Sequence, residues 1–486
     1  MLTKSERKSV IQMVDMELFV PQDHLVRKID NTIDFEFIRE KVKHLYSDEV
    51  GRPSIDPVVL FKMVLIQYLF GIKSMRQTVK EIEVNIAYRW FLGLDFNDPV
   101  PHYSTFSKNY ERRFANSNIF EEIFLEILNL VNSHGLLNKE SLFIDSTHTK
   151  AYANKKKIDN VDVVKSYNKY VQNLHDEINQ IRLSEGKKPL KEKKKKEIIS
   201  KTDPECGMFH KGEKERQLAY STQVACDENG WVTNVQVFPG NMNDNNSGVD
   251  FLEPIVDDPK VENLVMDAGY TSPVLLNQVL QKGKVPIIPY TRPKGAKTKG
   301  KDDQEPPFPS TSYKFNKDMN CYVCPMGVVL SYRGMNSDGK LVYKSKNKDC
   351  KNCPFKHRCT NQPYKEIQRH LLEHAADCAR NYRLSELGKE LYPKRKFTIE
   401  RCFAQTKFNN NLGFTFLRGI KKNQARALII FACHNLTKLA RILDKRVSKL
   451  QQLIKIFISK VFFLFTFLLI IKKASPKGHF VNTLKK

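Results

Sequence analysis

Two short apolar segments, each ending in an aspartate, constrain the fold of this chain more than any other feature. One segment reads Ser-Leu-Phe-Ile-Asp145 and the other reads Asn-Leu-Val-Met-Asp267. Apolar runs of this length are typical of buried strands, and two more are predicted over residues 231–238 and 285–289. Helical segments lie between and after these runs. The middle of the chain is therefore predicted to fold as an α/β sheet domain.

The region before the first of these strands is predicted to be helical. Residues 57–70 are apolar almost all round and predict a central buried helix. Further helices are expected from Ser74 and from Ser104. The last of them would expose three basic residues, Lys108, Arg112 and Arg113. Short helices with tight turns and a basic last helix are compatible with a helix-turn-helix DNA-binding module, and a plain helical bundle is the alternative interpretation.

Two segments are predicted to interrupt the sheet domain. Residues 155–215 are rich in lysine, and the apolar spacing over residues 164–181 is that of a short coiled-coil-like seam. The lysine run over residues 191–196 is either a solvated face or a contact for a DNA backbone. Residues 291–392 open with a stretch rich in Pro, Lys and Gly, and paired cysteines follow it.

The balance of charge indicates a polyanionic partner. Lys and Arg number 80 against 54 Asp and Glu, a net charge of +26, and such a field attracts nucleic acid or an anionic membrane surface. The hydrophobic run over residues 461–471 is about half the length of roughly 20 residues that a spanning helix needs. The chain also opens without the pattern of a secretory signal. We therefore expect an intracellular protein with no membrane partner, in which this run forms a buried helix or strand.

Asp145 and Asp267 occupy equivalent places at the ends of their predicted strands. Carboxylates on neighbouring strands would lie close together, and like charges that close are costly unless a cation neutralises them. Mg²⁺ is the natural occupant because it prefers oxygen ligands. Glu400 could supply a third carboxylate from a helix face that it shares with Phe403 and Lys407. Singly, each of these residues is also an ordinary turn residue, helix cap or salt-bridge partner.

These segments, in this order, resemble the catalytic core of DDE insertion-sequence transposases, which has an RNase H-like fold. The segment with Tyr392, Arg395, Glu400 and Lys407 is similar to the family's Tyr-x2-Arg-x3-Glu-x6-Lys signature. Four residues separate Arg395 from Glu400 where the signature has three, so Lys396 is an alternative for the Arg position. Further agreement comes from Thr202-Asp-Pro204 and from Gly240-Asn-Met-Asn-Asp244.

The resemblance implies a transposase that cleaves the ends of an insertion sequence and transfers them into target DNA with two Mg²⁺ ions. Asp145, Asp267 and Glu400 would be the catalytic residues and would hold the Mg²⁺. Terminal inverted repeats and target DNA would be its partners, with a homodimer on DNA expected by analogy, in the bacterial cytoplasm at the nucleoid. The expected DNA contacts are Lys407, Arg395, Lys396, Arg401, Arg112 and Arg113.

The resemblance also completes the predicted domain organisation. The regions are a helical N-terminal DNA-binding domain (1–135), an RNase H-like mixed-sheet core of the α/β class (136–290 and 393–445, with the lysine-rich insertion 155–215), a Cys-rich insertion (291–392) and a basic and hydrophobic C-terminal tail (446–486).

The Cys-rich insertion predicts a structural zinc site. Two Cys-x2-Cys-Pro pairs and a fifth cysteine follow one another there, and paired thiolates at this spacing can close a tetrahedral zinc site. Four of five cysteines would bind the zinc, with His357 a further option; the five are Cys321, Cys324, Cys350, Cys353 and Cys359. The alternative is a set of reduced thiols in a region packed by other means. The other cysteines are expected in the core or at the surface.

Two other functions fit the same core. A metal-dependent DNA endonuclease would cleave DNA without joining it, and a catalytically retired, transposase-derived protein would bind DNA without cleaving it. A ribosomal or membrane-surface protein would explain the charge, but not the spaced carboxylates.

Overall fold

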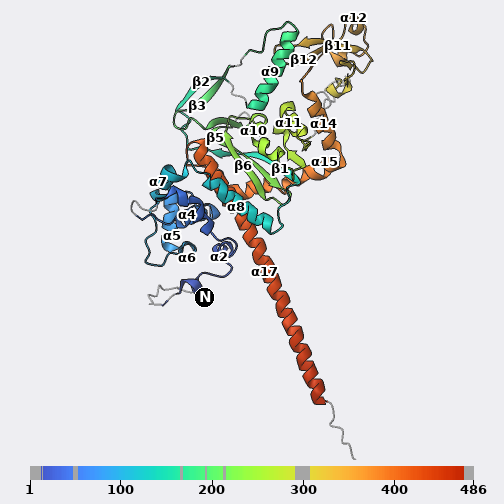
Figure 1. Ribbon diagram of the computed structural model, residues 1–486. Coiled ribbons are helices and arrows are strands. Elements are labelled where there is room, and N and C mark those ends of the chain that lie inside the picture. The colour runs from blue at the N-terminus through green and yellow to red at the C-terminus, as the bar shows by residue number, and fades with distance from the viewer. Residues whose placement is uncertain are drawn as a thin grey trace, which may run out of the picture. The chain divides into compact units, whose positions relative to one another are not determined.

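The computed structural model describes residues 13, 15–47, 53–164, 168–191, 194–211, 215–289 and 307–474. The chain divides into two compact units (Figure 1). The first unit comprises Met1–Ile66, Met75–Ser107 and Cys433–Lys486, and the second comprises Gln67–Ser74 and Lys108–Ala432.

The first unit contains short helices from the N-terminal part of the chain, together with the portion of the long helix Ile420–Ala474 that begins at Cys433. The predicted central helix is confirmed as α4 (Pro57–Leu69), in which every residue except Val59 and Lys62 is buried. The helices predicted from Ser74 and Ser104 are confirmed as α5 (Met75–Val84) and α7 (Ser104–Asn109). The remaining helices are α1 (Met16–Phe19), α2 (Leu25–Asp30), α3 (Glu36–Val42) and α6 (Ile86–Leu92).

A mixed sheet forms the centre of the second unit, which confirms the α/β class. Its order is β4-β5-β1-β7-β8, and β6 pairs with β5 as well. Strand β5 runs antiparallel to β1, β4 and β6, whereas β1, β7 and β8 are parallel. The strands are β1 (Ser141–Lys150), β4 (Gly207–Lys211), β5 (Glu215–Asp227), β6 (Val232–Pro239), β7 (Asn263–Met266) and β8 (Val285–Ile287).

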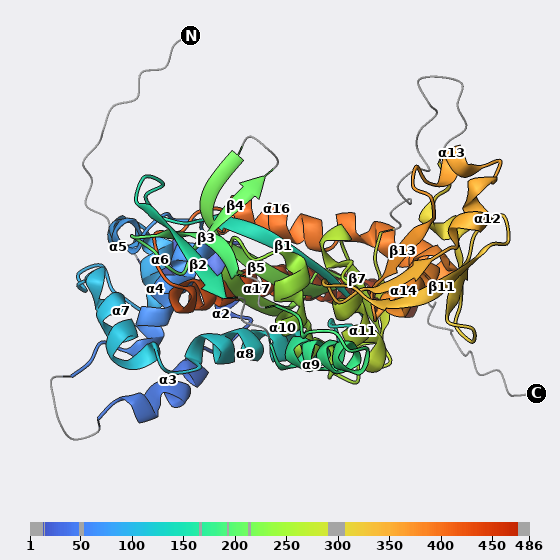
Figure 2. The same cartoon turned by 90° about the horizontal axis from the view of Figure 1, so that it is seen from above.

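Helices α10 (Asp244–Val256) and α11 (Pro273–Gln281) cover one face of this sheet (Figure 2). Leu142 and Ile144 of β1 and Met266 of β7 pack with them in one buried apolar cluster. The π-helical turn Tyr110–Phe114 and helix α8 (Ile119–Ser133) precede the sheet in the chain. The central strand therefore has an apolar face fixed by packing, which sets the register of the residues that follow it.

The lysine-rich segment contains a hairpin and a helix. Strands β2 (Ile158–Val164) and β3 (Lys194–Ser200) pair with each other, and α9 (Lys169–Ser184) lies between them in the chain. Leu174 and Ile178 of the predicted seam pack against Met335, so this face of α9 is covered within the chain. Tyr167 of the seam and the centre of the lysine run lie outside the described residues.

A second, antiparallel sheet of order β13-β12-β11-β10-β9 follows in the Cys-rich region. The Pro-, Lys- and Gly-rich stretch that opens this region lies, up to residue 306, outside the described part of the chain. The strands and short helices are β9 (Lys314–Asn316), β10 (Cys321–Val323), β11 (Val329–Met335), β12 (Leu341–Lys344), α12 (Asn347–Lys351), α13 (Lys356–Cys359) and β13 (Glu366–Arg369).

Four helices complete the chain: α14 (Glu373–Leu384), α15 (Glu386–Leu391), α16 (Ile399–Asn409) and α17 (Ile420–Ala474). The backbone of the hydrophobic run 461–471 is helical, and the burial expected of this run stays a prediction. Within the described residues, we find no helix that combines the length and the apolar character required to cross a membrane.

A buried carboxylate fixes the turn before α17. Asp203 is 1% exposed and accepts hydrogen bonds from the Tyr220 hydroxyl at 2.7 Å and from the Gly419 backbone N–H at 3.1 Å. Gly419 has a φ of +87°, which a residue with a side chain rarely adopts. The motif residue Asp203 thus joins strand β5 to the start of a helix some two hundred residues later.

Tyr220→Phe tests this junction. The substitution removes one donor from the buried Asp203 carboxylate and should lower the free energy of unfolding by about 1–3 kcal/mol. Denaturant unfolding curves would measure the change. Tyr152→Phe, at an exposed ring, is the control, and equal stability of the two variants would contradict the role of Asp203.

Candidate active site

The two predicted aspartates lie next to each other on adjacent parallel strands. Strands β1 and β7 pair with Ile144 opposite Met266, so Asp145 and Asp267 both follow the last residue pair of the ladder. The prediction that Asp145 ends its strand was wrong: β1 continues to Lys150 because β5 pairs with it along its whole length. Asp267 does end β7, and its carboxylate accepts a hydrogen bond from the Gly269 N–H at 2.6 Å.

A third carboxylate, which the sequence analysis did not assign to the site, adjoins Asp267. Asp244 is the first residue of α10, and it accepts a hydrogen bond from Gln223 Nε2 at 3.0 Å. A Cβ atom on Gly269 would lie 2.6 Å from Asp244 Oδ2 and 2.9 Å from Asp267 Oδ1, so this glycine lies between the two carboxylates. The segment Gly240-Asn-Met-Asn-Asp244 after β6 could have indicated this carboxylate. An aspartate at that place is, however, also common as a residue that begins a helix.

Arg395 forms an ion pair with Asp145. Its Nη2 atom lies 2.7 Å from Asp145 Oδ2, and the arginine is 7% exposed. Arg395 belongs to the short 3-10 helix Tyr392–Lys396, which immediately precedes α16, and its guanidinium lies 5.7 Å from the Tyr392 ring centroid. The arginine predicted to contact DNA is therefore buried against a predicted catalytic carboxylate.

Electrostatics couples the three aspartates. Burial raises the pKa of Asp145 to about 7; Arg395 opposes this, and the charges of Asp267 and Asp244 add to it. Burial also raises the pKa of Asp244, with a further contribution from Asp267. The Tyr270 hydroxyl donates to Gln223 Oε1, and burial followed by the three carboxylates raises the pKa of Tyr270. A cation in this group would relieve the cost of its negative charges.

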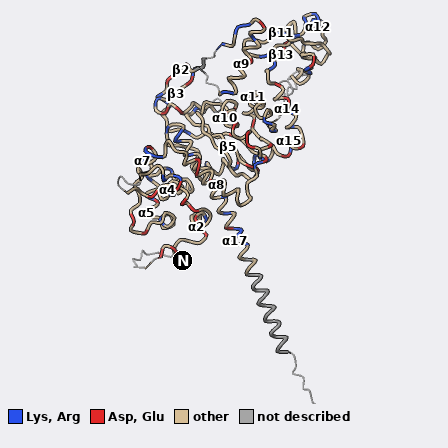
Figure 3. The backbone as a smooth tube through the Cα atoms, viewed as in Figure 1, with Lys and Arg blue, Asp and Glu red and all other residues tan. Residues whose placement is uncertain are grey.

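Glu400 and the remaining basic candidates lie mostly on the surface. Glu400 is exposed near the start of α16, a helix that packs against β1 and β5. Lys396, Arg401, Lys407 and Arg112 are exposed, whereas Arg113 is half-buried and donates to Asn109 Oδ1 at 2.5 Å. Lys and Arg are spread along the backbone of both units (Figure 3). Among the residues that the structure describes, no three His, Cys, Asp or Glu side chains are arranged to hold a metal ion.

His148 lies on β1, three residues beyond Asp145. Its ring stacks on Phe209 of β4, with centroids 3.5 Å apart. Burial lowers the pKa of His148 to about 4, and the nearby charge of Lys407 acts in the same direction. His148 is therefore a neutral, packed side chain at neutral pH.

None of the ten cysteines forms a disulfide bond. Cys206, Cys226, Cys402 and Cys433 are buried and Cys378 is exposed, as expected for cysteines of the core and surface. Of the five zinc candidates, four line one pocket, and Cys321 is not among its lining residues.

Comparison with known protein families gives two matches. Residues 14–112 match the family described as Transposase domain (DUF772), and residues 323–440 match the family described as Transposase DDE domain. No curated protein and no solved structure matches the chain. Two transposase domains, together with a mixed sheet that carries neighbouring carboxylates, define a protein of the transposase class.

Together the two matches support an insertion-sequence DDE transposase. Arg395, Glu400 and Lys407 lie inside the DDE match, whereas Asp145 and Asp267 lie outside both matches. The resemblance found in the sequence is confirmed at the level of the family, and with it a transposase function in general terms. The Mg²⁺ expected for the site is the metal that DDE transposases generally use.

Because the pKa of His148 is lowered, we expect the free energy of unfolding to depend on pH through this residue. An unfolded histidine takes up its proton near pH 6.5, whereas folded His148 does so only near pH 4. Its contribution to stability is therefore present above pH 6.5 and is lost as the pH falls towards 4. Thermal unfolding temperatures between pH 4 and 7 should fall less steeply for His148→Gln than for the wild type. His210→Gln, at an exposed position on β4, should keep the wild-type slope, and an unchanged slope for His148→Gln would refute the assignment.

Proposed function

We propose that this protein cuts the ends of an insertion sequence and joins the freed 3′ ends to target DNA in an Mg²⁺-dependent reaction. The observation that carries the proposal is the pairing of Asp145 and Asp267 on adjacent parallel strands. Support comes from Glu400, which lies within the DDE match on a helix packed against β1.

We assign the mixed sheet to the RNase H-like class. Without β4, the strands lie in the order β6-β5-β1-β7-β8, which is 3-2-1-4-5 when these five strands are numbered along the chain. Strand β5 pairs antiparallel with β6 and β1, whereas β1, β7 and β8 pair in parallel. In this arrangement the aspartates of the central parallel pair lie towards the carboxyl end of the ladder between the two strands. Ligands of open α/β sheets bind beyond the carboxyl ends of such strands.

The chemistry of the site suits Mg²⁺. Its donors are carboxylate oxygens, which Mg²⁺ prefers, and the mutual repulsion of Asp145, Asp244 and Asp267 would be relieved by a divalent cation. Asp145, Asp267 and Glu400 would hold the metal. Bound there, two Mg²⁺ ions would supply activation of the attacking oxygen and neutralisation of charge on the leaving oxygen.

The neighbouring residues would position these ligands. Arg395 holds one oxygen of Asp145, and Gly269 leaves room for Asp244 and Asp267 to approach. Asp244 accepts from Gln223, which the Tyr270 hydroxyl fixes in turn. We assign Asp244 a positioning role, and we keep Glu400, which lies within the DDE match, as the third ligand.

The DNA would be held by basic residues on more than one element. Lys407, Lys396 and Arg401 surround the exposed side of α16, and Arg112 and Arg113 belong to the helical region within residues 1–135 that we assign to end recognition. Residues 136–290 and 393–445 would form the catalytic core. A homodimer that pairs two ends at the nucleoid completes the proposal, by analogy with the family.

Substitution of the proposed ligands tests the function. Asp145→Asn, Asp267→Asn and Glu400→Gln should each lower end cleavage by more than about a hundredfold, because loss of even an outer-shell partner of a metal costs 10- to 100-fold. Asp244→Asn should cost less than the ligands do. The assay uses DNA carrying the element's ends with Mg²⁺, and EDTA gives the background.

The products of the same assay separate the alternatives. Cleavage followed by joining to a plasmid supports the transposase. Cleavage without joining would replace it by an endonuclease, and binding without cleavage would replace it by a retired enzyme. If Glu400→Gln keeps full activity while Asp244→Asn loses it, the third ligand is Asp244.

Lys407→Ala tests the DNA contact. Loss of one phosphate contact should weaken binding and reduce the slope of log K against log salt by about 1. Lys260→Ala is the control, because Lys260 precedes β7 and lies at the opposite end of that strand from Asp267. Equal salt slopes for the two variants would exclude Lys407 from the phosphate contacts.

A further inference from the structure

We propose that Cys324, Cys350, Cys353 and Cys359 bind one structural Zn²⁺ that stabilises the small antiparallel sheet β9–β13. This site is separate from the carboxylate site. The proposal therefore does not depend on the catalytic activity of the protein.

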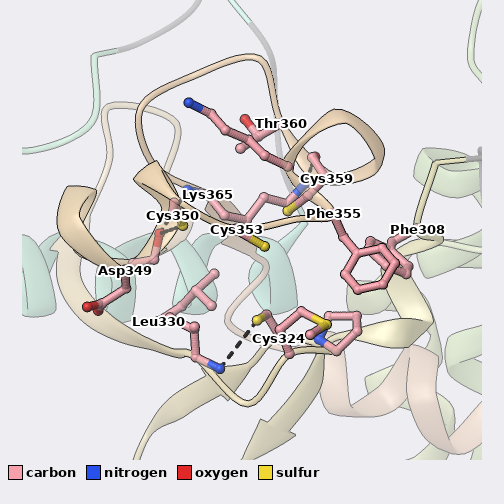
Figure 4. A pocket seen from close by; sticks show the side chains of 15 residues that line it. Phe308, Cys324, Leu330, Asp349, Cys350, Cys353, Phe355, Cys359, Thr360 and Lys365 are labelled. Carbon is pink, nitrogen blue, oxygen red and sulfur yellow. Dashed lines mark hydrogen bonds between the residues drawn. The ribbon is translucent and has the colours of Figure 1, made fainter.

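The four cysteines line one pocket, although they are spread over 36 positions of the sequence counted inclusively from Cys324 to Cys359. Figure 4 shows their sulfur atoms around a common space, with Cys324 across from the other three. The pocket, which eleven other residues line as well, has a volume of about 20 Å³, enough for about one water molecule. Four thiolates around a single atom are the donor set of a closed structural zinc site.

Cys321 is excluded from this set. It lies in β10, 3% exposed, where its backbone pairs with Ser331 on one side and Asn316 on the other. It is not among the residues that line the pocket. The structure therefore selects four ligands from the five candidates that the sequence left open.

A tight turn presents the Cys324 thiol to the pocket. The Cys324 N–H donates to Val328 O at 2.9 Å, and the Val328 N–H donates to Cys324 Sγ at 3.3 Å. The turn needs Gly327, whose φ is +79°. A backbone N–H directed at sulfur stabilises a thiolate, as it does in other metal sites where outer-shell donors orient the ligands.

Two hydroxyl groups contact the thiols of Cys350 and Cys359, and a lysine lies beside Cys359. Tyr313 Oη lies 3.0 Å from Cys359 Sγ, and Ser345 Oγ lies 3.1 Å from Cys350 Sγ. Lys365 Nζ donates to the Cys359 carbonyl at 3.0 Å and lies over the Tyr313 ring. Four thiolates around Zn²⁺ carry a net charge of −2, which these donors and the lysine would stabilise.

The small sheet has little core to hold it without a metal. Among the described residues, its fully buried apolar cluster consists of Tyr313, Tyr322, Leu330 and Tyr343, and seven partly buried hydrophobic side chains pack against it, Cys324 and Cys359 among them. A cluster of this size gives limited stabilisation, and small units of this kind are commonly completed by a metal or by disulfides. Since the cysteines form no disulfide bond, zinc fills this role.

Zinc binding requires that the thiols lose their protons and turn inwards. As thiols, no three of them are arranged as ligands in the described part of the chain, and those of Cys350 and Cys359 contact hydroxyl groups instead. One proton leaves each of the four thiols as Zn²⁺ binds, and the sulfur charges are shared with the metal. Affinity should therefore fall as the pH is lowered.

Zinc content of the purified full-length protein is the first test. Elemental analysis should give about one zinc per chain, and replacement by Co²⁺ should give the absorption of tetrahedral cobalt with thiolate charge-transfer bands. Cys324→Ser, Cys350→Ser, Cys353→Ser and Cys359→Ser should each lose the metal or bind it far more weakly. Cys321→Ser and Cys378→Ser, at cysteines outside the pocket, should retain it.

A titration of the wild-type protein with a thiol reagent tests the site even if the cysteine variants do not fold. A mercurial reagent should release the zinc as the pocket thiols react, and release should lower the thermal unfolding temperature. Protein that carries no zinc after growth and purification with added zinc would overturn the proposal. So would retention of zinc by Cys359→Ser together with its loss in Cys321→Ser, or a disulfide or an iron cluster at these cysteines. Asp267→Asn should keep its zinc, which separates this outcome from failure of the catalytic proposal.

Discussion

The parallel pairing of β1 with β7 is the constraint on which the candidate site depends. It is held by apolar residues on both strands, with Leu142, Ile144 and Met266 buried in the cluster that α10 and α11 complete. Because register in a sheet is fixed wherever one face is buried, this packing also fixes which residues follow the ladder. Asp145 and Asp267 are those residues. A slip by one position would separate them and turn the apolar side chains outwards.

Bringing three carboxylates together is unfavourable, and the surrounding residues compensate for it in part. Arg395 neutralises one oxygen of Asp145, and Gln223 and the Gly269 N–H donate to Asp244 and Asp267. The pKa of Asp145 is still raised to about 7, mainly by burial. The raised pKa shows that the charged form of Asp145 remains unfavourable in this group, and a bound cation would relieve that cost. Movement of Arg395 away from Asp145 would free an oxygen for a metal.

Strands β1, β6, β7 and β8 and helix α4 could be predicted because they follow from local apolar patterns. Strand β5 and the small sheet β9–β13 were not predicted, since their segments lack such a pattern. The end of β1 could not be predicted, because it is set by pairing with β5, a partner more than sixty residues away. Asp244 was missed because an aspartate at the start of a helix has an ordinary local explanation. Arg395 was predicted to contact DNA because basic residues of a DNA-binding protein commonly contact phosphate groups. Its ion pair with Asp145 was not predicted, because the two residues are far apart in the sequence. The five candidate zinc ligands could be reduced to four only from the structure, in which Cys321 does not line the pocket.

The two proposed metal sites are connected through the chain that joins them. Arg369 at the end of β13 donates to Tyr322 Oη at 2.9 Å, lies over the Phe315 ring, and pairs with Asp377 of α14 at 3.4 Å. Helix α14 in turn buries Ala375 and Ala379 in the apolar cluster behind β1 and β7. Helix α15 and the short helix that carries Arg395 follow directly. The ion pair of Arg369 with Asp377 thus links the small sheet to the start of the segment whose end reaches Asp145 through Arg395.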